Sequence, residues 1–162
     1  MGTIMLGIGD YAATRAPGDI VKTMALGSCV AVILLDPETQ TAGMVHIALP
    51  DSTLNAEKKE KQPGYFADSG ISALIAEMNK MGVKKNIRDM YIKLAGGANV
   101  LKAGISFDIG KRNILMIKKI LWQLGTGPVA EDTGGHISRT VSVAVDTGIV
   151  EISCPGKGTW TI

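Results

Sequence analysis

The apolar and polar residues of this chain alternate between short strand-like runs and two longer stretches with helical spacing. In residues 65–81 and 109–124, apolar side chains recur every three or four positions, and each stretch is closed by a glycine suited to ending a helix. Eight shorter runs favour β-strands: residues 3–13, 20–24, 29–35, 41–49, 89–95, 128–131, 139–145 and 149–154. The pattern predicts an α+β fold, with a mainly antiparallel mixed sheet and two principal helices.

The segments between these elements are mostly short turns. Residues 52–64, STLNAEKKEKQPG, form the one long polar stretch, and we expect a surface loop there that lies beside Cys29 as a lid. After the strand at 89–95, the residues Gly96-Gly97-Ala98 are expected to turn the chain into a short helix or loop through Leu101. The chain contains no internal repeat and no linker-like stretch, so one domain over residues 1–162 is predicted.

The most informative segment is residues 23–30, TMALGSCV. It places Cys29 directly after a glycine corner and at the head of the apolar, β-branched run 29–35. The following apolar run, 41–49, contains His46. A thiol and an imidazole therefore occur on two consecutive predicted strands.

The turn between those strands sets how the two side chains meet. Asp36 to Thr39, DPET, has turn chemistry, with proline at its second position. If these four residues are the hairpin loop, Leu35 pairs with Gln40 and Cys29 lies directly opposite His46. Directly opposed residues share a face of the sheet, with Cβ atoms about 5 Å apart. The sequence therefore predicts a thiol–imidazole pair.

Such a pair has the composition of a nucleophilic site. A nearby protonated imidazole lowers the pKa of a thiol, so we expect Cys29 to be activated by His46. The corner formed by Gly27 and Ser28 leaves backbone N–H groups near the sulfur, where they could form an oxyanion hole.

Each of these residues also has an ordinary structural interpretation. Free cysteines are among the most buried residues and are mostly inert, and a lone histidine in an apolar strand is usually a core residue. A catalytic base also needs a group that orients its second ring nitrogen, for which the nearby hydroxyls of Thr23 and Thr41 are both candidates.

Composition and charge exclude several classes of function. Aromatic residues make up only 4% of the chain, which argues against a base-stacking surface, and the net charge of +2 gives no electrostatic footprint for nucleic acid or anionic lipid. No apolar run approaches the ~18 residues that a membrane-spanning helix needs. The N-terminal residues lack the features of a signal peptide, so we expect a cytoplasmic protein in which Cys29 and Cys154 are free thiols.

Metal and nucleotide sites are not predicted. The two cysteines and two histidines show no zinc-ligand spacing, and the chain contains neither of the common phosphate-binding glycine motifs. We therefore expect no metal and no cofactor. Cys154 has no partner motif and is predicted to have no role in the chemistry.

Together these motifs resemble the CheD family of chemoreceptor glutamine deamidases. The resemblance spans nearly the whole chain, in family order, through five segments: TMALGSCVAV (23–32), GMVHIALPD (43–51), KLAGGA (93–98), IGKRN (109–113) and EDTGG with Arg139 (131–139). It implies an α/β sandwich similar to the catalytic domain of cytotoxic necrotizing factor toxins. It also implies hydrolysis of receptor glutamine side chains to glutamate, by a protein-glutamine glutaminase.

The resemblance assigns the roles of individual residues. Cys29 is the nucleophile, His46 the base and Thr23 the third member of the site. Two partners are implied: the cytoplasmic helices of chemoreceptors as substrate, and the phosphatase CheC, whose activity the family stimulates. A regulatory module that stimulates CheC without catalysis is the alternative function, whereas a thiol protease is disfavoured because nothing indicates an extended cleft for a peptide backbone.

Overall fold

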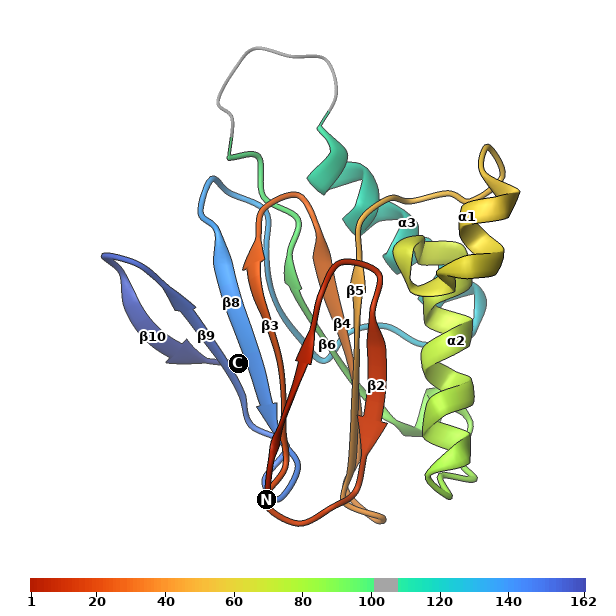
Figure 1. The fold of residues 1–162 in the computed structure, drawn as a ribbon, viewed down its shortest axis with the longest axis vertical. Helices are drawn as coiled ribbons and strands as arrows, with labels where there is room; N and C mark the ends of the chain where they lie inside the picture. The colour runs from red at the N-terminus through yellow and green to blue at the C-terminus, as the bar shows by residue number, and fades with distance from the viewer. Residues whose placement is uncertain (101–107) are drawn as a thin grey trace.

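The computed structural model describes residues 1–100 and 108–162, which form two five-stranded sheets and three α-helices (Figure 1). The first sheet has the order β1 (Thr3–Leu6), β3 (Ile20–Leu26), β8 (Arg139–Ala144), β9 (Val150–Cys154) and β10 (Gly158–Thr161). The second has the order β2 (Tyr11–Thr14), β5 (Thr41–Ile47), β4 (Val30–Asp36), β6 (Tyr91–Gly96) and β7 (Ala130–Thr133). The helices are α1 (Ala56–Lys61), α2 (Ala67–Lys80) and α3 (Ile109–Gln123), with single 3₁₀ turns at Pro63–Tyr65 and Ile87–Asp89.

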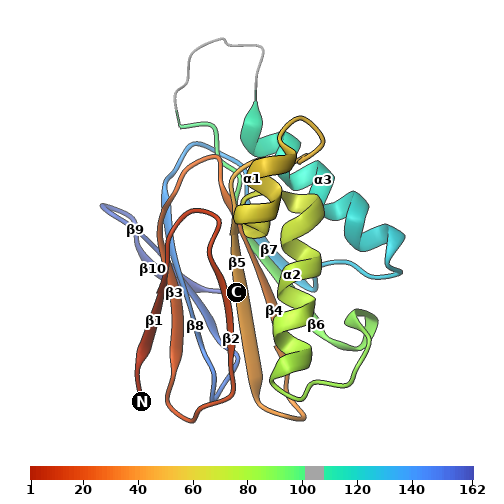
Figure 2. The same ribbon diagram turned by 45° about the vertical axis from the view of Figure 1, so that its right-hand side comes forward.

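The three layers are the first sheet, the second sheet and the helices, which cover the outer face of the second sheet (Figure 2). The second sheet is therefore enclosed on both faces, which explains why every residue of β4 and β5 is buried. Alternate side chains of these strands enter two separate cores, one between the sheets and one under the helices. Pairing is antiparallel except between β1 and β3 and between β6 and β7, so both sheets are mixed.

The α+β prediction is confirmed, but the prediction of a single sheet is wrong. The expected strand 3–13 is two strands, and the turn at 7–10 between them carries the chain from the first sheet to the second. Gly9 permits this change of direction with a φ of +80°. The sequence pattern also missed β10, a short and mostly exposed edge strand.

The two principal helices lie where they were predicted, whereas the loop predicted at 52–64 does not exist as such. Asn55 caps α1 by accepting a hydrogen bond from the N–H of Lys58 at 3.0 Å, and Pro63 begins the following 3₁₀ turn. The predicted extension of the Gly96-Gly97-Ala98 turn to Leu101 falls partly outside the described residues.

The β4–β5 hairpin forms as predicted but with a different register. Asp36 pairs with Thr41 and Leu35 with Ala42, so the loop contains four residues, 37–40, and begins one residue later than expected. Gln40 has a φ of +49°, which lets it serve as the last loop residue. Each residue of β4 therefore pairs with a residue of β5 two positions further along than expected, such as Leu35 with Ala42 instead of Gln40. Because this shift is even, every side chain keeps its face of the sheet.

A bulge in β3 reshapes the strand just before the chain crosses to the second sheet. Thr23 pairs with Val141 and Leu26 with Arg139, so β3 has one residue more than β8 between these pairs. Ala25, inside the bulge, has a φ of +56°, a left-handed conformation that costs an L-residue about 1–2 kcal/mol. The bulge redirects the chain into the crossing that contains Cys29.

Replacing Ala25 by glycine tests this strain. Glycine removes the steric cost but adds ~0.5–1 kcal/mol of unfolded-state entropy, so Ala25→Gly is expected to keep or raise the free energy of unfolding by up to about 1 kcal/mol. The matched control Ala130→Gly, in β7 without positive φ, should lose ~0.5–1 kcal/mol. Urea denaturation measures both variants, and equal losses would contradict the strain at Ala25.

Candidate active site

The residues predicted to carry the chemistry meet at one end of the sandwich, between the two sheets. Thr23 lies on β3 of the first sheet and His46 near the end of β5 of the second. Cys29 lies in the crossing from β3 to β4, one residue before β4 begins. The ends of β3, β5 and β6 and the start of β4 therefore converge on this region (Figure 1).

Thr23 and His46 are joined across the space between the sheets. The Thr23 Oγ1 lies 2.7 Å from His46 Nδ1, and the same hydroxyl donates to the carbonyl oxygen of Leu6 at 2.9 Å. Because the hydroxyl has one proton and Leu6 O can only accept, Oγ1 must accept from an Nδ1–H group. This fixes the neutral tautomer of His46, with a lone pair on Nε2.

That lone pair has no partner among the residues that the structure describes. His46 Nε2 is buried and makes no hydrogen bond within residues 1–100 and 108–162. An unsatisfied buried acceptor is uncommon in proteins and calls for an explanation. A base that must accept a proton from a neighbouring group has this arrangement.

Cys29 lies on the same face of the second sheet as His46, although it is not directly opposite. Ala31 faces His46 in the β4–β5 pair, and Cys29, two residues earlier, packs with the same intersheet core as Ala31. The predicted direct opposition is therefore wrong by the register shift described above. Because that shift is even, continuing the register one residue beyond Val30 keeps Cys29 on the imidazole face, diagonal to His46, where cross-strand side chains lie about 7–8 Å apart.

Burial keeps both members of this pair neutral. It raises the pKa of the Cys29 thiol above its ordinary 9.0, against a smaller opposing effect of the residue's own N–H. Burial also lowers the pKa of His46 below 6.5, and the nearby negative charge of Asp10 only partly offsets it. The expectation that a protonated His46 lowers the Cys29 pKa is wrong for the resting site, which contains a thiol and a neutral imidazole near pH 7.

The turn that bears Cys29 is held from its far side by the segment after β6. Gly97 N–H donates to Cys29 O at 2.8 Å, and Ala98 N–H donates to Gly27 O at 2.9 Å. Gly96 and Gly97 both have positive φ, and a Cβ on Gly96 would collide with Cys29 O. This close approach of two backbones explains the glycine pair in the KLAGGA segment.

Asn113 completes this support and was not identified from the sequence. Its fully buried amide donates to Ser28 O and to Ala48 O, both at 3.0 Å. One side chain thus connects the residue before Cys29 to the strand end that follows His46. The signal in the sequence is an asparagine at helical spacing from Ile117, on the face of α3 that packs against the rest of the protein.

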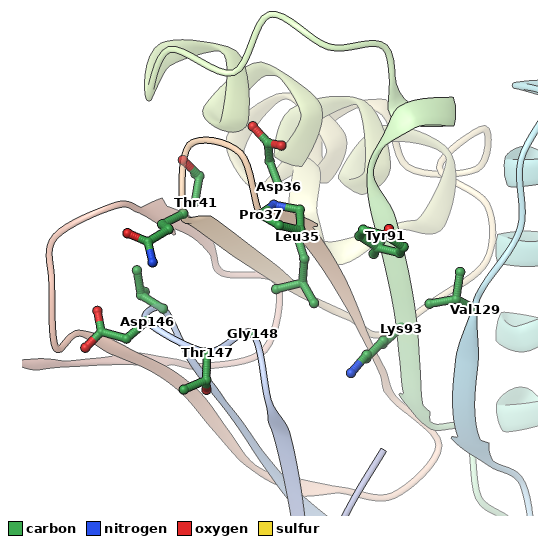
Figure 3. A pocket seen from close by; sticks show the side chains of 12 residues that line it. Leu35, Asp36, Pro37, Thr41, Tyr91, Lys93, Val129, Asp146, Thr147 and Gly148 are labelled. Atoms are coloured by element: carbon green, nitrogen blue, oxygen red, sulfur yellow. The ribbon is translucent and has the colours of Figure 1, made fainter.

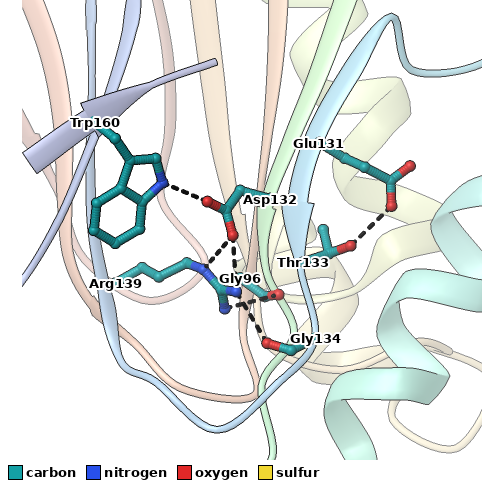
Figure 4. A network of polar contacts seen from close by, with 7 residues as sticks. All are labelled: Gly96, Glu131, Asp132, Thr133, Gly134, Arg139 and Trp160. Carbon is teal, nitrogen blue, oxygen red and sulfur yellow. Dashed lines mark hydrogen bonds and ion pairs between the residues drawn. The ribbon is translucent and has the colours of Figure 1, made fainter. Parts of the chain in front are cut away.

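A buried polar network ties the same end of the two sheets together (Figure 4). Arg139 on β8 donates twice to Asp132 Oδ1 on β7, at 3.1 and 2.9 Å, and also donates to Gly134 O at 3.0 Å. Trp160 on β10 donates to the other oxygen of Asp132. Because Gly134 N–H also bonds Gly96 O, the network positions the glycine segment that contacts Cys29.

Two other candidates lie away from this site. Thr41 is at the opposite end of β5 from His46, where its hydroxyl pairs with Thr39, so Thr23 and not Thr41 orients the imidazole. Cys154 ends β9, where its Sγ contacts Pro155 O. Both cysteines are free thiols, as predicted.

A cavity of about 370 Å³ also lies at the far end of β4 and β5 (Figure 3). Leu35, Thr41, Tyr91 and Asp146 are among its lining residues, and none of Thr23, Cys29 and His46 reaches it. The position of the polar groups, and not cavity size, therefore identifies the candidate site.

Within residues 1–100 and 108–162, no cluster of three or more potential metal ligands occurs. In the same ranges, no helix has the length and apolar character needed to cross a bilayer.

These observations define an α+β protein with a thiol, an imidazole and a hydroxyl converging between two sheets. The family model described as "CheD chemotactic sensory transduction" matches residues 48–154. A Syntrophotalea carbinolica protein named "Probable chemoreceptor glutamine deamidase CheD" is 55% identical over the full length of both chains. The Thermotoga maritima protein named "Chemoreceptor glutamine deamidase CheD" is 40% identical, over 95% of this chain and 93% of its own. This chain belongs to the CheD family.

Similarity to solved structures adds little. A Bacillus licheniformis protein, "hypothetical protein YfiH", matches 75% of this chain and 49% of its own with a TM-score of 0.43 and 14% identity. A likeness of this size carries no argument about fold or function. The expected similarity to cytotoxic necrotizing factor toxins stays a prediction.

The neutral state of Cys29 can be tested by alkylation. Only the thiolate reacts readily with iodoacetamide, so the raised pKa predicts that the alkylation rate of Cys29 keeps rising with pH and reaches no plateau below pH 9. The reaction is followed by mass spectrometry in a Cys154→Ser variant, so that a single thiol is labelled. A rate that has already reached its plateau at pH 7 would contradict the neutral pair and indicate a preformed ion pair with His46.

Proposed function

We propose that this chain is a protein-glutamine deamidase that converts glutamine side chains on the cytoplasmic helices of chemoreceptors to glutamate, and that it acts in the cytoplasm. The observation that carries the proposal is the Thr23–His46 hydrogen bond, which leaves a buried, unpartnered Nε2 on the face that Cys29 shares. The full-length relative with 55% identity is named for this activity, which supports the choice of substrate.

The first half of the reaction makes a thioester. His46 Nε2 takes the thiol proton as the sulfur attacks the carboxamide carbon, and the resulting imidazolium gives a proton to the leaving nitrogen. The C–N bond breaks, ammonia departs and an acyl–Cys29 thioester remains. Since the resting thiol and imidazole are both neutral, proton transfer accompanies attack and does not precede substrate binding.

The second half returns the free enzyme. The same Nε2 takes a proton from water as its oxygen attacks the thioester, and the C–S bond then breaks to give glutamate and the Cys29 thiol. Thr23 acts in both halves by keeping Nδ1 protonated and the ring fixed. These steps need no cofactor, because every proton is carried by His46 or water.

The turn at Gly27 and Ser28 supplies the proposed oxyanion hole. The carbonyls of Gly27, Ser28 and Cys29 all accept hydrogen bonds from the segment after β6 or from α3. Within the described residues, no acceptor pairs with the N–H of Gly27 or Ser28. These donors are therefore available to the oxygen that becomes negative during attack, an interaction worth ~10²–10³ in rate per donor.

The deamidation itself is the direct test. A folded cytoplasmic fragment of a chemoreceptor, incubated with the full chain, should gain one mass unit at particular glutamines in peptide mass spectrometry. Cys29→Ala should abolish this gain, while the control Cys154→Ser should keep it. Deamidation that persists in Cys29→Ala would show that the assigned nucleophile is wrong.

The same variant separates catalysis from binding of CheC, which we propose as a second partner. Cys29→Ala is expected to bind CheC as the unmodified chain does, since the change removes one half-buried sulfur. CheC binding without any deamidation by the unmodified chain would favour the purely regulatory function.

Thr23 provides a second test of the site. Thr23→Val removes the acceptor for Nδ1–H and the donor to Leu6 O, so kcat is expected to fall by about 10²-fold and the unfolding free energy by ~1–3 kcal/mol. Thr23→Ser keeps the hydroxyl and most of the activity. The control Thr14→Val removes a buried hydroxyl at the other end of the sandwich and should lose stability alone. An active Thr23→Val would contradict the orienting role.

A further inference from the structure

The turn between β1 and β2 contacts both members of the Thr23–His46 pair. It leaves the first sheet at Leu6, whose carbonyl accepts the Thr23 hydroxyl, and enters the second sheet at Tyr11. Within it, Gly9 N–H donates to His46 O at 2.8 Å. The turn therefore spans the two sheets at the point where the imidazole is oriented.

Gly9 and Asp10 form a bulge opposite His46. Gly9 N–H bonds His46 O, and His46 N–H bonds Asp10 O at 3.0 Å, so two residues of one strand face one residue of the other. The φ of +80° at Gly9 is typical of the first position of such a bulge. Tyr11 pairs with Val45, and continuing this register places Asp10 directly opposite His46 on the same face, with Cβ atoms about 5 Å apart.

The sheet order makes Asp10 and Cys29 flank the imidazole. Strand β5 lies between β2 and β4, so the extension of β2 brings Asp10 to one side of His46 and the start of β4 brings Cys29 to the other. The thiol can therefore deliver a proton to the ring from the β4 side, while the negative charge of the Asp10 carboxylate acts on the ring from the β2 side.

The carboxylate of Asp10 is held in place by the turn itself. Its Oδ2 accepts the N–H of Gly7 at 2.8 Å, and the turn is secured from outside by Gln62, whose amide donates to Ile8 O at 2.7 Å. The backbone of Gly64 also packs against Gly9, where a side chain would collide. This support explains why the 3₁₀ turn at Pro63–Tyr65 lies beside the site.

Apart from Asp10, the strands packed around His46 place no net charge beside its imidazole ring. Leu6, Thr23 and Ala31 are uncharged, and the Cys29 thiol is neutral near pH 7. Arg139 and Asp132 are bonded to one another, so their charges largely cancel. Among the charged groups of the described residues, only Asp10 raises the pKa of His46, against the effect of burial.

We propose that Asp10 is the charged positioning residue of this site: its carboxylate stabilises the His46 imidazolium that forms when Nε2 takes the proton of Cys29. The inference rests on the proposed role of His46 as the base. Thr23 orients the ring but is neutral, so it cannot offset the positive charge that develops there. Asp10 supplies the negative charge that offsets it, and it does so without taking the place of Thr23 at Nδ1.

Asp10→Asn removes the charge but keeps an oxygen to accept the Gly7 N–H. Proton NMR titration of the full chain measures the His46 pKa, with His136→Gln used to assign the second histidine. The pKa should fall further below 6.5 in Asp10→Asn. It should not change in the control Asp146→Asn, an exposed aspartate at the other end that also accepts a glycine N–H. An unchanged His46 pKa in folded Asp10→Asn overturns the proposal.

A measurement on the unmodified chain covers the case in which the variant does not fold. Asp10 is exposed, so its effect is screened by salt, and the His46 pKa should fall when NaCl is raised from about 0.05 to 0.5 M. A pKa independent of salt overturns the proposal as well.

Kinetics on a receptor fragment then connect the charge to the reaction. Asp10→Asn should lower kcat by about two- to five-fold with KM unchanged, the range expected for one exposed charge interaction. Asp10→Glu keeps the negative charge and should retain most of the kcat of the unmodified chain. If His46→Gln keeps its deamidase activity, the proposed function fails in its assignment of the base, whereas the titration of Asp10→Asn still decides whether the carboxylate acts on the ring.

Discussion

The hydrogen bond between Thr23 and His46 is the constraint on which the site depends. It places a polar pair inside an intersheet core that is otherwise largely apolar, and it joins β3 of one sheet to β5 of the other. A buried hydroxyl and imidazole are tolerated only when their hydrogen bonds are made, so the pair aligns the two sheets as well as orienting the ring. The hydroxyl proton goes to Leu6 O and Nδ1–H goes to Oγ1, so Nε2 is the atom of this pair that has no hydrogen-bond partner within the described residues.

Both sheet crossings that serve this pair depart from regular strand geometry. The β3 bulge at Ala25 redirects the chain toward Cys29, and the Gly9–Asp10 bulge turns the chain from Leu6 to the strand beside His46. Such irregularities weaken a sheet locally, and they are common where a side chain must be aimed at a functional site. In this chain they bring residues from two sheets to a single imidazole.

Much of the site could be predicted from the sequence because its determinants are local. Cys29 follows a glycine corner, His46 lies on the next strand, and the face shared by two strands survives an error of two residues in their register. Helical spacing likewise located α2 and α3, since each buries a continuous apolar stripe. The choice of Thr23 over Thr41 was not local: it came from the resemblance to the CheD family, and the contact across the sheets supports it. Long-range packing also decided what the pattern missed, including the division into two sheets, the link made by Asn113 and the raised pKa of Cys29.

The tautomer of His46 is the most direct test of this account, because the function of Nε2 as a base depends on the proton being at Nδ1. Nitrogen-15 NMR of the labelled chain near pH 7.5 distinguishes the two neutral tautomers and the imidazolium, and a His136→Gln variant assigns the signals. The ring is expected to be neutral and protonated at Nδ1, and to change toward a mixture of tautomers in Thr23→Val. A ring protonated at Nε2, or an imidazolium at that pH, would contradict it.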